Sequence, residues 1–430
     1  MIGPAARRIL FWGMDAIRNG IVKEHYEDIS AKNESDSFST EQLEKLLEHA
    51  KKTVPFYRNQ DYLNINEFPI LTKKDFKEDY DAFKSHAFLN STTHEMSTSG
   101  STGTPFIIQQ DINKRKRTVA ELIYFNHIAG QKLGDRYMYI KAFLKPKSFM
   151  ERIKQNVIPV EILRFDKSVL EEIRLTLKKD KSIGSILAYS SSYEILANYL
   201  YDLQDKPDMF NLKALFSSSA VLTDDTKDKL VKVFGCPVID RYSNQENGVL
   251  AQTKETYGNF YINRASYYIE LLKISGDESA AKGEPGRIVI TDLYNFAMPM
   301  IRYDTGDLAV SDDDNRNNLK TLRNIQGRRV DIIFDTEGSM MTPHTWSVHM
   351  RKYNQLKQWQ FIQEDKKKYI LKVNGAEGIY SKDDFDNTLR SILGSDAEID
   401  IQYVDEIPVL ASGKFKNTIC NYKPDHQESL

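Results

Sequence analysis

The sequence is poor in cysteine, with two among its 430 residues. Cys236 and Cys420 cannot build a disulfide framework, and two thiolates are too few for a structural zinc site. The eight histidines show neither a His-Glu-x-x-His spacing nor a companion Cys-x-x-Cys pair. We therefore expect a protein of a reducing, cytoplasmic compartment.

Net charge and long apolar runs are also missing. The 59 basic and 61 acidic side chains leave a formal charge of −2, and the basic residues are spread along the chain. This balance does not indicate a nucleic-acid partner or an acidic membrane surface. The apolar run Ile9–Trp12 is four residues long, far short of a signal sequence or of the roughly 20 residues that span a membrane. We expect no integral membrane segment.

The N-terminal residues have the spacing of a helix. Leu10, Met14 and Ile17 recur at intervals of four and three, which predicts an amphipathic helix. We expect the apolar side of this helix to pack on the body of the protein. Contact with a membrane surface is the alternative that the sequence leaves open.

The length of the chain predicts two domains, because one hydrophobic core stops growing at about 250–300 residues. Helix-like stretches alternate with β-branched or aromatic runs, which indicates α/β architecture. We place the domain boundary near Gly327, after the polar stretch Ser311–Asn318. The prediction is a large N-terminal domain, 1–326, with β-sheets and packed helices, and a small C-terminal α+β domain, 327–430.

The segment Ser97–Pro105 contains two glycines and no bulky apolar side chain. Backbone amides and hydroxyls packed this densely can wrap phosphate oxygens, because glycine admits the conformations that a nest of amides needs. A plain Ser/Thr/Gly linker is the alternative. No Lys follows Gly103 at the position that a P-loop requires, so the sequence excludes a P-loop nucleotide-binding protein.

A second segment, Asp240–Gly248, follows the short apolar run Pro237–Ile239. We expect it at the carboxyl end of a strand, where α/β sheets place their ligands. Glu246 is then a candidate Mg²⁺ ligand beside nucleotide phosphates, because Mg²⁺ prefers oxygen ligands. Tyr242 can stack on a purine. A turn that carries a solvated glutamate is the alternative.

Three further segments with candidate site residues lie toward the C-terminus. Asp304 and Asp307 flank a glycine, and they can accept hydrogen bonds from ribose hydroxyls or build an Asx turn. Arg328 offers a fork of donors to phosphate or ribose. Lys414 stands alone on a loop of small residues. For Arg328 and Lys414, an ordinary surface charge is the alternative.

The order of these motifs resembles the adenylate-forming superfamily of acyl-CoA synthetases, adenylation domains and luciferases. A Ser/Thr/Gly loop, Tyr-x3-Glu, Tyr-Asp-Thr-Gly-Asp, Gly-Arg and Gly-Lys follow one another over most of the chain. Leu47–Tyr57 and Phe68–Lys73 are similar to the phenylacetate–CoA ligase-like branch. Within that branch, Tyr242–Gly248 and Pro408–Lys414 resemble the CapK-like proteins of capsular-polysaccharide biosynthesis. The resemblance implies the adenylate-forming fold for the N-terminal domain.

The resemblance also implies a role for each matching residue. Glu246 would bind Mg²⁺, and Lys414 would reach the α-phosphate and the substrate carboxylate, so these two are the implied catalytic residues. Asp307 would hold the ribose hydroxyls, assisted by Arg328. The other implied nucleotide-binding residues are Thr98, Ser99, Gly100, Ser101, Thr102, Gly103 and Thr104 on the phosphates, Ser219 and Ala220 on the adenine side, and Arg241, Tyr242, Ser243, Asn244 and Gln245, of which Tyr242 would stack on adenine.

Two positions depart from the pattern of the superfamily. Many relatives have Ser or Thr immediately before the metal-binding glutamate, where this chain has Gln245. Relatives also often carry a polar hinge residue where Val330 stands, with Asp331 next in this chain.

The implied activity is that of an ATP-dependent, AMP-forming ligase. It would use ATP and Mg²⁺ to activate a carboxylic acid as an acyl-adenylate and would pass the acyl group to an acceptor. The CapK-like features favour an amine or hydroxyl acceptor in surface-polysaccharide biosynthesis, and transfer to CoA is the alternative. A catalytically silent binding protein with the same fold is a further alternative, against which Glu246, Asp307 and Lys414 argue. The acid and the oligomeric state stay open.

Overall fold

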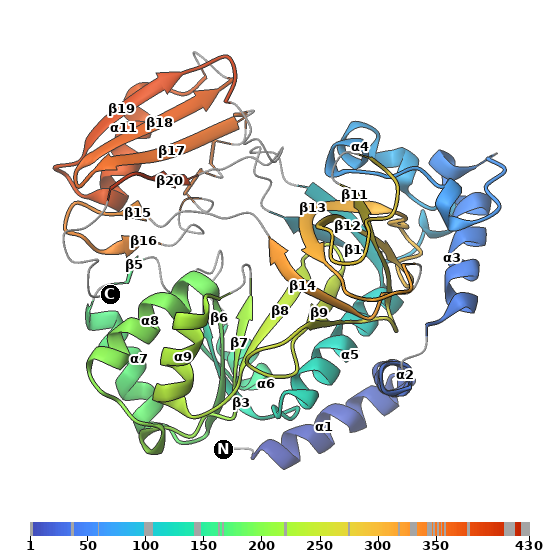
Figure 1. The fold of residues 1–430 in the computed structure, drawn as a ribbon, viewed down its shortest axis with the longest axis horizontal. Coiled ribbons are helices and arrows are strands. Elements are labelled where there is room, and N and C mark those ends of the chain that lie inside the picture. Colours follow the sequence, from blue (N-terminus) through green and yellow to red (C-terminus); the bar gives the residue numbers. More distant parts are fainter. Residues whose placement is uncertain are drawn as a thin grey trace.

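The structure is a computed structural model, drawn as a ribbon in Figure 1. It describes residues 3–35, 38–58, 60–98, 106–141, 148–161, 164–165, 167–218, 222–273, 276–316, 319–326, 333–341, 346, 349–350, 352–353, 355–356, 358–375, 379–407 and 418–422. The α-helices are α1 (Pro4–Ile17), α2 (Ile21–Glu34), α3 (Thr40–Thr53), α4 (Lys73–Glu78), α5 (Ile112–Ile128), α6 (Phe149–Gln155), α7 (Lys167–Lys179), α8 (Ser190–Asp202), α9 (Asp224–Phe234) and α11 (Lys382–Leu393).

The strands alternate with these helices along the first half of the chain and dominate the second half. They are β1 (Thr93–Thr98), β2 (Phe106–Asp111), β3 (Arg136–Ile140), β4 (Val157–Val160), β5 (Arg164–Phe165), β6 (Ile183–Tyr189), β7 (Ala214–Ser218), β8 (Val238–Asn244), β9 (Gly248–Gln252), β10 (Phe260–Ile262), β11 (Tyr267–Lys273), β12 (Gly286–Asp292), β13 (Tyr303–Val310), β14 (Thr321–Gln326), β15 (Ile333–Phe334), β16 (Met340–Met341), β17 (Gln358–Asp365), β18 (Lys368–Asn374), β19 (Glu398–Tyr403) and β20 (Thr418–Cys420).

The N-terminal part is organised by one long sheet. Among the described residues it has 11 strands in the order β11-β12-β13-β14-β10-β9-β8-β7-β6-β3-β4. The strands from β4 to β8 are parallel, and β9 then turns back antiparallel to β8. Apolar side chains of α7, α8 and α9 cover one face of the parallel strands, while α5 lies on the other side (Figure 1). The change of strand direction at β8 and β9 falls at the Glu246 turn.

The C-terminal part has its own sheet and core. Its strands run in the order β19-β18-β17-β20. Helix α11 packs on this sheet through Phe385, Leu389, Ile392 and Leu393, which are all buried. A short sheet in the order β15-β16-β5 joins this part to the N-terminal chain. The predicted fold class, a large sheet-rich α/β domain followed by a small α+β domain, is confirmed.

The predicted boundary at residue 327 stays a prediction, because residues 327–332 lie outside the described part of the chain. Local patterns agree with the structure where it can be compared. The stripe Leu43, Leu46, Leu47 and Ala50 of α3 is buried. The Ser39 side chain accepts a hydrogen bond from the Gln42 amide at 3.3 Å and caps this helix.

The expected packing of the N-terminal helix is wrong. Helix α1 forms, but Leu10, Met14 and Ile17 are 53%, 48% and 86% exposed. The helix is attached by its opposite side, where Phe11 and Trp12 are partly buried against a small core of α2 and α5. Among the described residues, none of the helices is long and apolar enough to cross a membrane.

Candidate active site

The Glu246 turn lies where the sequence predicts it, directly after a strand that belongs to the parallel part of the sheet. Strand β8 ends at Asn244, and β9 begins at Gly248. The Asn247 amide donates to Asn244 Oδ1 at 2.8 Å and closes the turn. Glu246 is 2% exposed. Its burial contradicts the alternative of a solvated glutamate.

Two side chains from distant parts of the sequence contact the Glu246 carboxylate. Lys73 Nζ lies 2.9 Å from Oε1, and the Tyr303 hydroxyl donates to the same oxygen at 3.2 Å. Burial, with the neighbouring Glu246 charge, raises the pKa of Tyr303 well above its usual range, so Tyr303 keeps its proton and remains a donor. A buried carboxylate needs such partners, because a lone charge out of water is costly.

Lys73 is held in place by the beginning of α4. Thr72 and Asp75 form a capping box, in which the Thr72 amide donates to Asp75 Oδ2 at 2.7 Å. Leu71 pairs with Tyr303 in a short parallel bridge, and its amide donates to the Arg302 carbonyl at 3.0 Å. The bridge sets the first residue of α4 beside the first residue of β13. Lys73 therefore reaches Glu246 from a fixed backbone.

The hairpin of β1 and β2, which flanks the Ser/Thr/Gly segment, ends beside Tyr303 and Lys73. Thr98 of β1 pairs with Phe106 of β2, so the two ends of that segment lie opposite each other. The Phe106 ring stacks on Tyr303 with centroids 6.1 Å apart, and Lys73 Nζ lies 5.5 Å from the Phe106 centroid. The structure thus brings the flanks of the predicted phosphate loop next to the Glu246 carboxylate.

The two carboxylates around Gly306 have different partners. Asp304 Oδ1 accepts from the Gly306 amide at 2.8 Å, which is the Asx turn, and its Oδ2 pairs with Arg287 Nη1 at 2.6 Å. Asp307 instead faces Tyr242, whose hydroxyl donates to Asp307 Oδ2 at 3.0 Å. Gly306 has φ +77°, a conformation that favours glycine. Asp304 builds the turn, and Asp307 is the carboxylate presented beside Tyr242.

A network of buried polar side chains holds the Glu246 turn in place. Gln110 Nε2 donates to the Glu246 carbonyl at 2.8 Å, and the Tyr267 hydroxyl donates to the Asn247 carbonyl at 2.8 Å. Lys114 and Asp292 form an ion pair of 2.7 Å with both side chains fully buried. Burial raises the pKa of Glu121, which lies beside Tyr267. These contacts tie the turn to β2 and β11, and Tyr267 links it further to Lys114 and Glu121 of α5.

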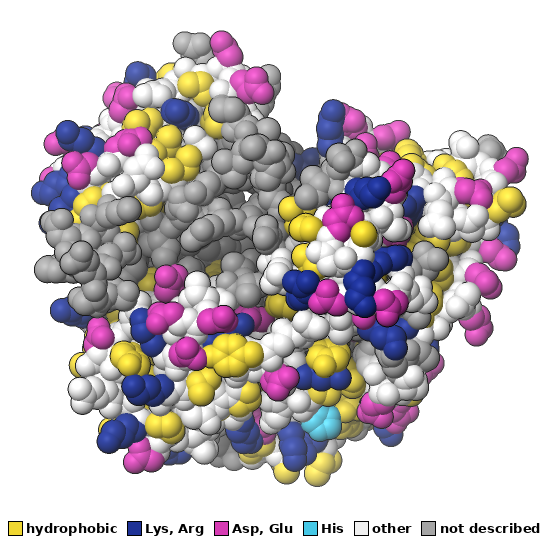
Figure 2. Space-filling view, in the orientation of Figure 1, with side chains coloured by type: hydrophobic (Ala, Val, Ile, Leu, Met, Phe, Trp, Pro, Cys, Tyr) yellow, Lys and Arg dark blue, Asp and Glu magenta, His cyan; other side chains and the backbone are white. Residues whose placement is uncertain are grey.

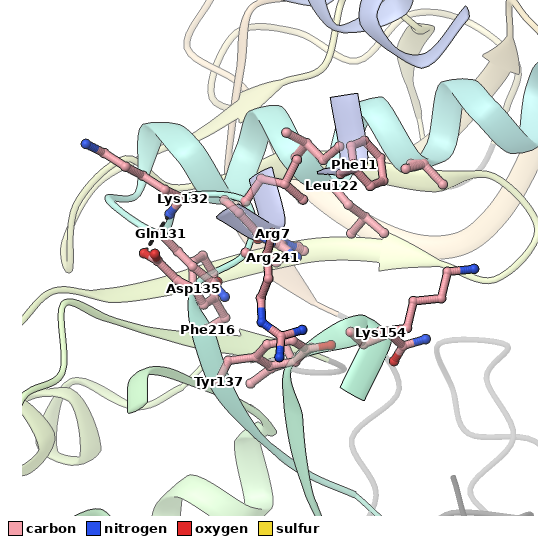
Figure 3. A pocket seen from close by; sticks show the side chains of 17 residues that line it. Arg7, Phe11, Leu122, Gln131, Lys132, Asp135, Tyr137, Lys154, Phe216 and Arg241 are labelled. Carbon is pink, nitrogen blue, oxygen red and sulfur yellow. Dashed lines mark hydrogen bonds between the residues drawn. The ribbon is translucent and has the colours of Figure 1, made fainter. Parts of the chain in front are cut away.

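Arg241 points to the other face of β8 from Tyr242. Its Nε donates to Gln252 Oε1 at 2.8 Å and its Nη2 to Asn126 Oδ1 at 2.7 Å, so both acceptors are neutral. Burial lowers the pKa of Arg241 to about 10. The guanidinium lines a cavity of about 330 Å³ between α5, the parallel strands and α1. Figure 3 shows Arg7 and Arg241 near the middle of this pocket, close to Tyr137.

Similarity to known proteins extends over most of the chain. Residues 333–421 match the family model of the CapK C-terminal domain. The chain is 24% identical to protein CapK of Staphylococcus aureus, over 93% of each chain. It is 26% identical to a phenylacetate-coenzyme A ligase of Pseudomonas putida, over 69% of this chain and 72% of that relative. Among solved structures, a 2-hydroxyisobutyryl-CoA ligase in complex with 2-HIB-AMP and CoA superposes with a TM-score of 0.55 at 17% identity, over 89% of this chain and 88% of that one.

The chain has the fold of that CoA ligase, and its residues 333–421 are similar to the CapK C-terminal domain. The resemblance stated from the sequence is therefore confirmed. In this chain the Tyr242 hydroxyl contacts Asp307, and the Glu246 charge acts on Tyr242. Ser243 and Gln245 are exposed on the same strand and turn, and Asn244 closes the turn. The nucleotide-binding roles assigned to these residues and to Arg241 stay predictions.

Several predicted site residues lie wholly or partly outside the described part of the chain. Thr98 is described as the last residue of β1, without its side chain. The others that lie outside the described residues are Ser99, Gly100, Ser101, Thr102, Gly103, Thr104, Ser219, Ala220, Arg328 and Lys414. Lys73 was not predicted as a site residue. The sequence around Lys73 shows only the helix cap Thr72-x-x-Asp75 and the segment Phe68–Lys73 that is similar to the phenylacetate–CoA ligase-like branch. Neither indicates that the Lys73 side chain contacts Glu246.

Proposed function

We propose that this protein is an ATP-dependent, AMP-forming ligase that converts a carboxylic acid to an acyl-adenylate and transfers the acyl group to an acceptor. The observation that carries the proposal is the convergence of Glu246, Tyr242 and Asp307 at the carboxyl end of β8, beside the flanks of the Ser/Thr/Gly segment. Tyr242 and Glu246 belong to one motif and Asp307 to another, and a nucleotide site requires that such motifs meet. The adenylate-forming fold supports the same activity.

The chemistry explains the charges at the site. A carboxylate is a poor electrophile, and ATP converts one of its oxygens into part of an AMP leaving group. Two anions must meet for this, so cationic groups and backbone donors have to offset their repulsion and stabilise the departing pyrophosphate. We assign this role to Lys414 and to the segment Thr98–Thr104. Lys73 adds a positive charge beside Glu246.

The remaining predicted residues would hold the nucleoside. Asp307 would accept hydrogen bonds from the ribose hydroxyls, assisted by Arg328, and Tyr242 would stack on the adenine with Ser219 and Ala220 beside it. The hydrogen bond from Tyr242 to Asp307 keeps the two side chains together. That contact supports one shared nucleoside site.

The carboxylate of Glu246 suits Mg²⁺. No cluster of three or more His, Cys, Asp or Glu side chains suited to a metal occurs in the described part of the chain. Mg²⁺ does not need such a cage, since one or two carboxylates with substrate phosphates and water suffice. When bound, Mg²⁺ neutralises phosphate charge and polarises the phosphoryl oxygens. Glu246 already faces one cation, the Lys73 ammonium, which fits a carboxylate that can hold positive charge.

There are two candidates for the acyl acceptor, an amine or hydroxyl group and CoA. Similarity to protein CapK extends over 93% of the chain, whereas the phenylacetate-coenzyme A ligases match about 70%. This difference favours an amine or hydroxyl acceptor in surface-polysaccharide biosynthesis. The solved relative that carries CoA favours the second candidate, a CoA thioester. We also propose that residues 327–430 rotate between the two half-reactions, a hinge-type change.

The first prediction tests the adenylation chemistry. With the correct acid and MgCl₂, the protein should exchange labelled pyrophosphate into ATP and release AMP. A panel of carboxylic acids, each assayed alone and then with CoA or with amino sugars, identifies the acid by exchange and the acceptor by the consumption of ATP. Formation of ADP in place of AMP would contradict the proposal.

The second prediction concerns the pair of Lys73 and Glu246. Lys73→Met should lower the free energy of unfolding by about 1–2 kcal/mol, because it leaves a buried carboxylate without its cation while Lys73 itself is partly exposed. Added MgCl₂ should raise the melting temperature of this variant by replacing the lost charge.

The control for this prediction is the double variant Lys73→Met with Glu246→Gln. It should recover most of the lost stability and should not respond to MgCl₂, since no buried charge is left. The double-mutant cycle compares the unchanged protein, Lys73→Met, Glu246→Gln and the double variant by thermal melts and denaturant unfolding. Strictly additive effects, or an equal MgCl₂ response in both variants, would show that Glu246 does not hold a cation.

A further inference from the structure

The outward side of α1 carries no charged side chain. Its large residues are exposed to an unusual degree: Ile9 73%, Leu10 53%, Met14 48% and Ile17 86%. The small residues between them are also exposed, namely Ala5, Ala6, Gly13 and Ala16. At 100° per residue these eight positions form one continuous side of the 14-residue helix. We call this side the α1 apolar face.

The polar residues of α1 are turned toward the protein. Asp15 is buried, and its carboxylate accepts hydrogen bonds from the Val22 and Lys23 amides at 3.2 and 2.9 Å, which caps α2. Arg8 Nε donates to the Leu133 carbonyl at 3.2 Å. A Cβ at Gly134 would lie 2.6 Å from the Pro4 carbonyl oxygen, so the beginning of α1 is packed closely on that turn. The helix is firmly attached, and its apolar face is left in solvent.

Exposed apolar surface continues next to the helix. The cavity beneath α1 is bordered by Val119 and Leu122 of α5, which are 37% and 40% exposed. Phe11 of α1 lines the same cavity (Figure 3). In Figure 2, hydrophobic side chains project at the lower edge of the molecule, with charged side chains of both signs beside them. A contiguous apolar patch with polar residues at its border is a candidate interaction surface.

Most charges around the α1 apolar face are basic, and Glu27, which lines a pocket beside Ala16, pairs with Lys23 at 3.6 Å. Arg7 and Arg8 stand at its border, half-buried, and Arg18 is exposed directly after the helix. Lys132 and Lys154 border the cavity beside Arg7, and the one acidic side chain among its lining residues, Asp135, pairs with Lys213 at 3.2 Å. The whole chain carries −2, so this local excess of positive charge is not a property of the composition.

We propose that the α1 apolar face docks on the surface of an anionic lipid bilayer. An apolar side bordered by arginines is the pattern of a helix that lies in the plane of the interface. With 14 residues α1 is too short to span, since a spanning helix needs about 20. Helix α1 lies on the lower edge in Figure 1, away from the C-terminal sheet, so docking leaves that sheet free.

A second copy of the chain fits this surface less well. A 14-residue helix is about 21 Å long and about 10 Å wide, so one face presents about 200 Å². Two such faces would bury about 400 Å² together, well below the roughly 1,200 Å² of a stable interface. A bilayer needs no matching surface and supplies negative charge to the basic border.

Vesicle binding of the full chain tests the proposal. In flotation assays the protein should bind vesicles of equal parts phosphatidylcholine and phosphatidylglycerol, and should bind vesicles of phosphatidylcholine alone at least about fivefold less. Ile17→Glu should lower binding to the mixed vesicles by about tenfold or more, because it places a charge on the apolar face. Arg18→Glu should weaken binding to the mixed vesicles only.

The matched control is Leu63→Glu. Leu63 is 87% exposed, as Ile17 is, but follows α3 and lies outside the α1 apolar face. This variant should bind vesicles like the unchanged protein, and all three variants should melt at the same temperature as it does. Equal binding by Ile17→Glu and the unchanged protein would overturn the proposal. So would a dimer in light scattering that Ile17→Glu dissociates, because a second copy would then be the occupant.

Discussion

Lys414→Ala should slow adenylation by about 100- to 1,000-fold, equivalent to about 3–4 kcal/mol of transition-state stabilisation. The reason is electrostatic. The attacking carboxylate and the α-phosphate are both anionic, and a preorganised ammonium is the group that offsets their repulsion. The rate of acid-dependent pyrophosphate exchange measures this step. Thermal stability should change by less than about 0.5 kcal/mol, as is usual for surface substitutions.

The second half-reaction separates the alternatives for Lys414. Supplied with presynthesised acyl-adenylate, the variant should still transfer the acyl group, because the rotated C-terminal domain would have moved Lys414 away. Lys416→Ala, two residues further along, is the matched control and should leave both halves unchanged. An unaffected Lys414→Ala would mean an ordinary surface lysine. Equal damage to both half-reactions would refute the domain rotation but not the adenylation chemistry.

Glu246→Gln should lower ATP-dependent turnover by about 100-fold, because it removes the only charged Mg²⁺ ligand that we assign. The fold should persist. Glutamine keeps the shape of the side chain, and Lys73, 35% exposed, can then be solvated. The half-saturating MgCl₂ concentration should rise together with the loss of turnover, since both depend on the same carboxylate.

The matched control for this variant is Glu255→Gln, an exposed glutamate in the connection between β9 and β10. It removes an equal charge outside the site and should leave turnover and the MgCl₂ dependence unchanged. Melting temperatures of both variants establish that each is folded. If Glu246→Gln is folded and its MgCl₂ dependence equals that of the unchanged protein, Glu246 does not bind the metal.

The periodic elements could be predicted closely from the sequence, because the spacing of apolar residues is a local property. The i, i+3, i+4, i+7 spacing from Leu43 to Ala50 predicts the buried stripe of α3. β-Branched and aromatic runs predict strands at Phe260–Ile262 and Arg287–Thr291, and the structure has strands at Phe260–Ile262 and Gly286–Asp292. The same holds for α11, whose apolar positions fill the C-terminal core. Boundaries differ by one or two residues, since helix and strand ends depend on tertiary contacts.

The site could be predicted in part. Strand β8 ends in Tyr242–Asn244 because a buried apolar run precedes it, and parallel strands present such ends on one edge of the sheet. The separate roles of Asp304 and Asp307 could not be predicted. Both flank the same glycine, and only the position of Arg287 on the neighbouring strand assigns Asp304 to the turn. Burial of Glu246 was equally beyond the local pattern, which favoured a solvated residue.

By itself the sequence determined the order of the motifs, the α/β architecture and the residues that share a side of each helix. Tertiary structure alone decided which of those sides is covered. It joined Lys73 to Glu246 across 173 positions of the chain and left the apolar side of α1 in solvent. Periodicity reports that a helix has two unlike sides. Which side packs depends on the neighbouring elements. On α1 the buried side carries Asp15, whose carboxylate caps α2.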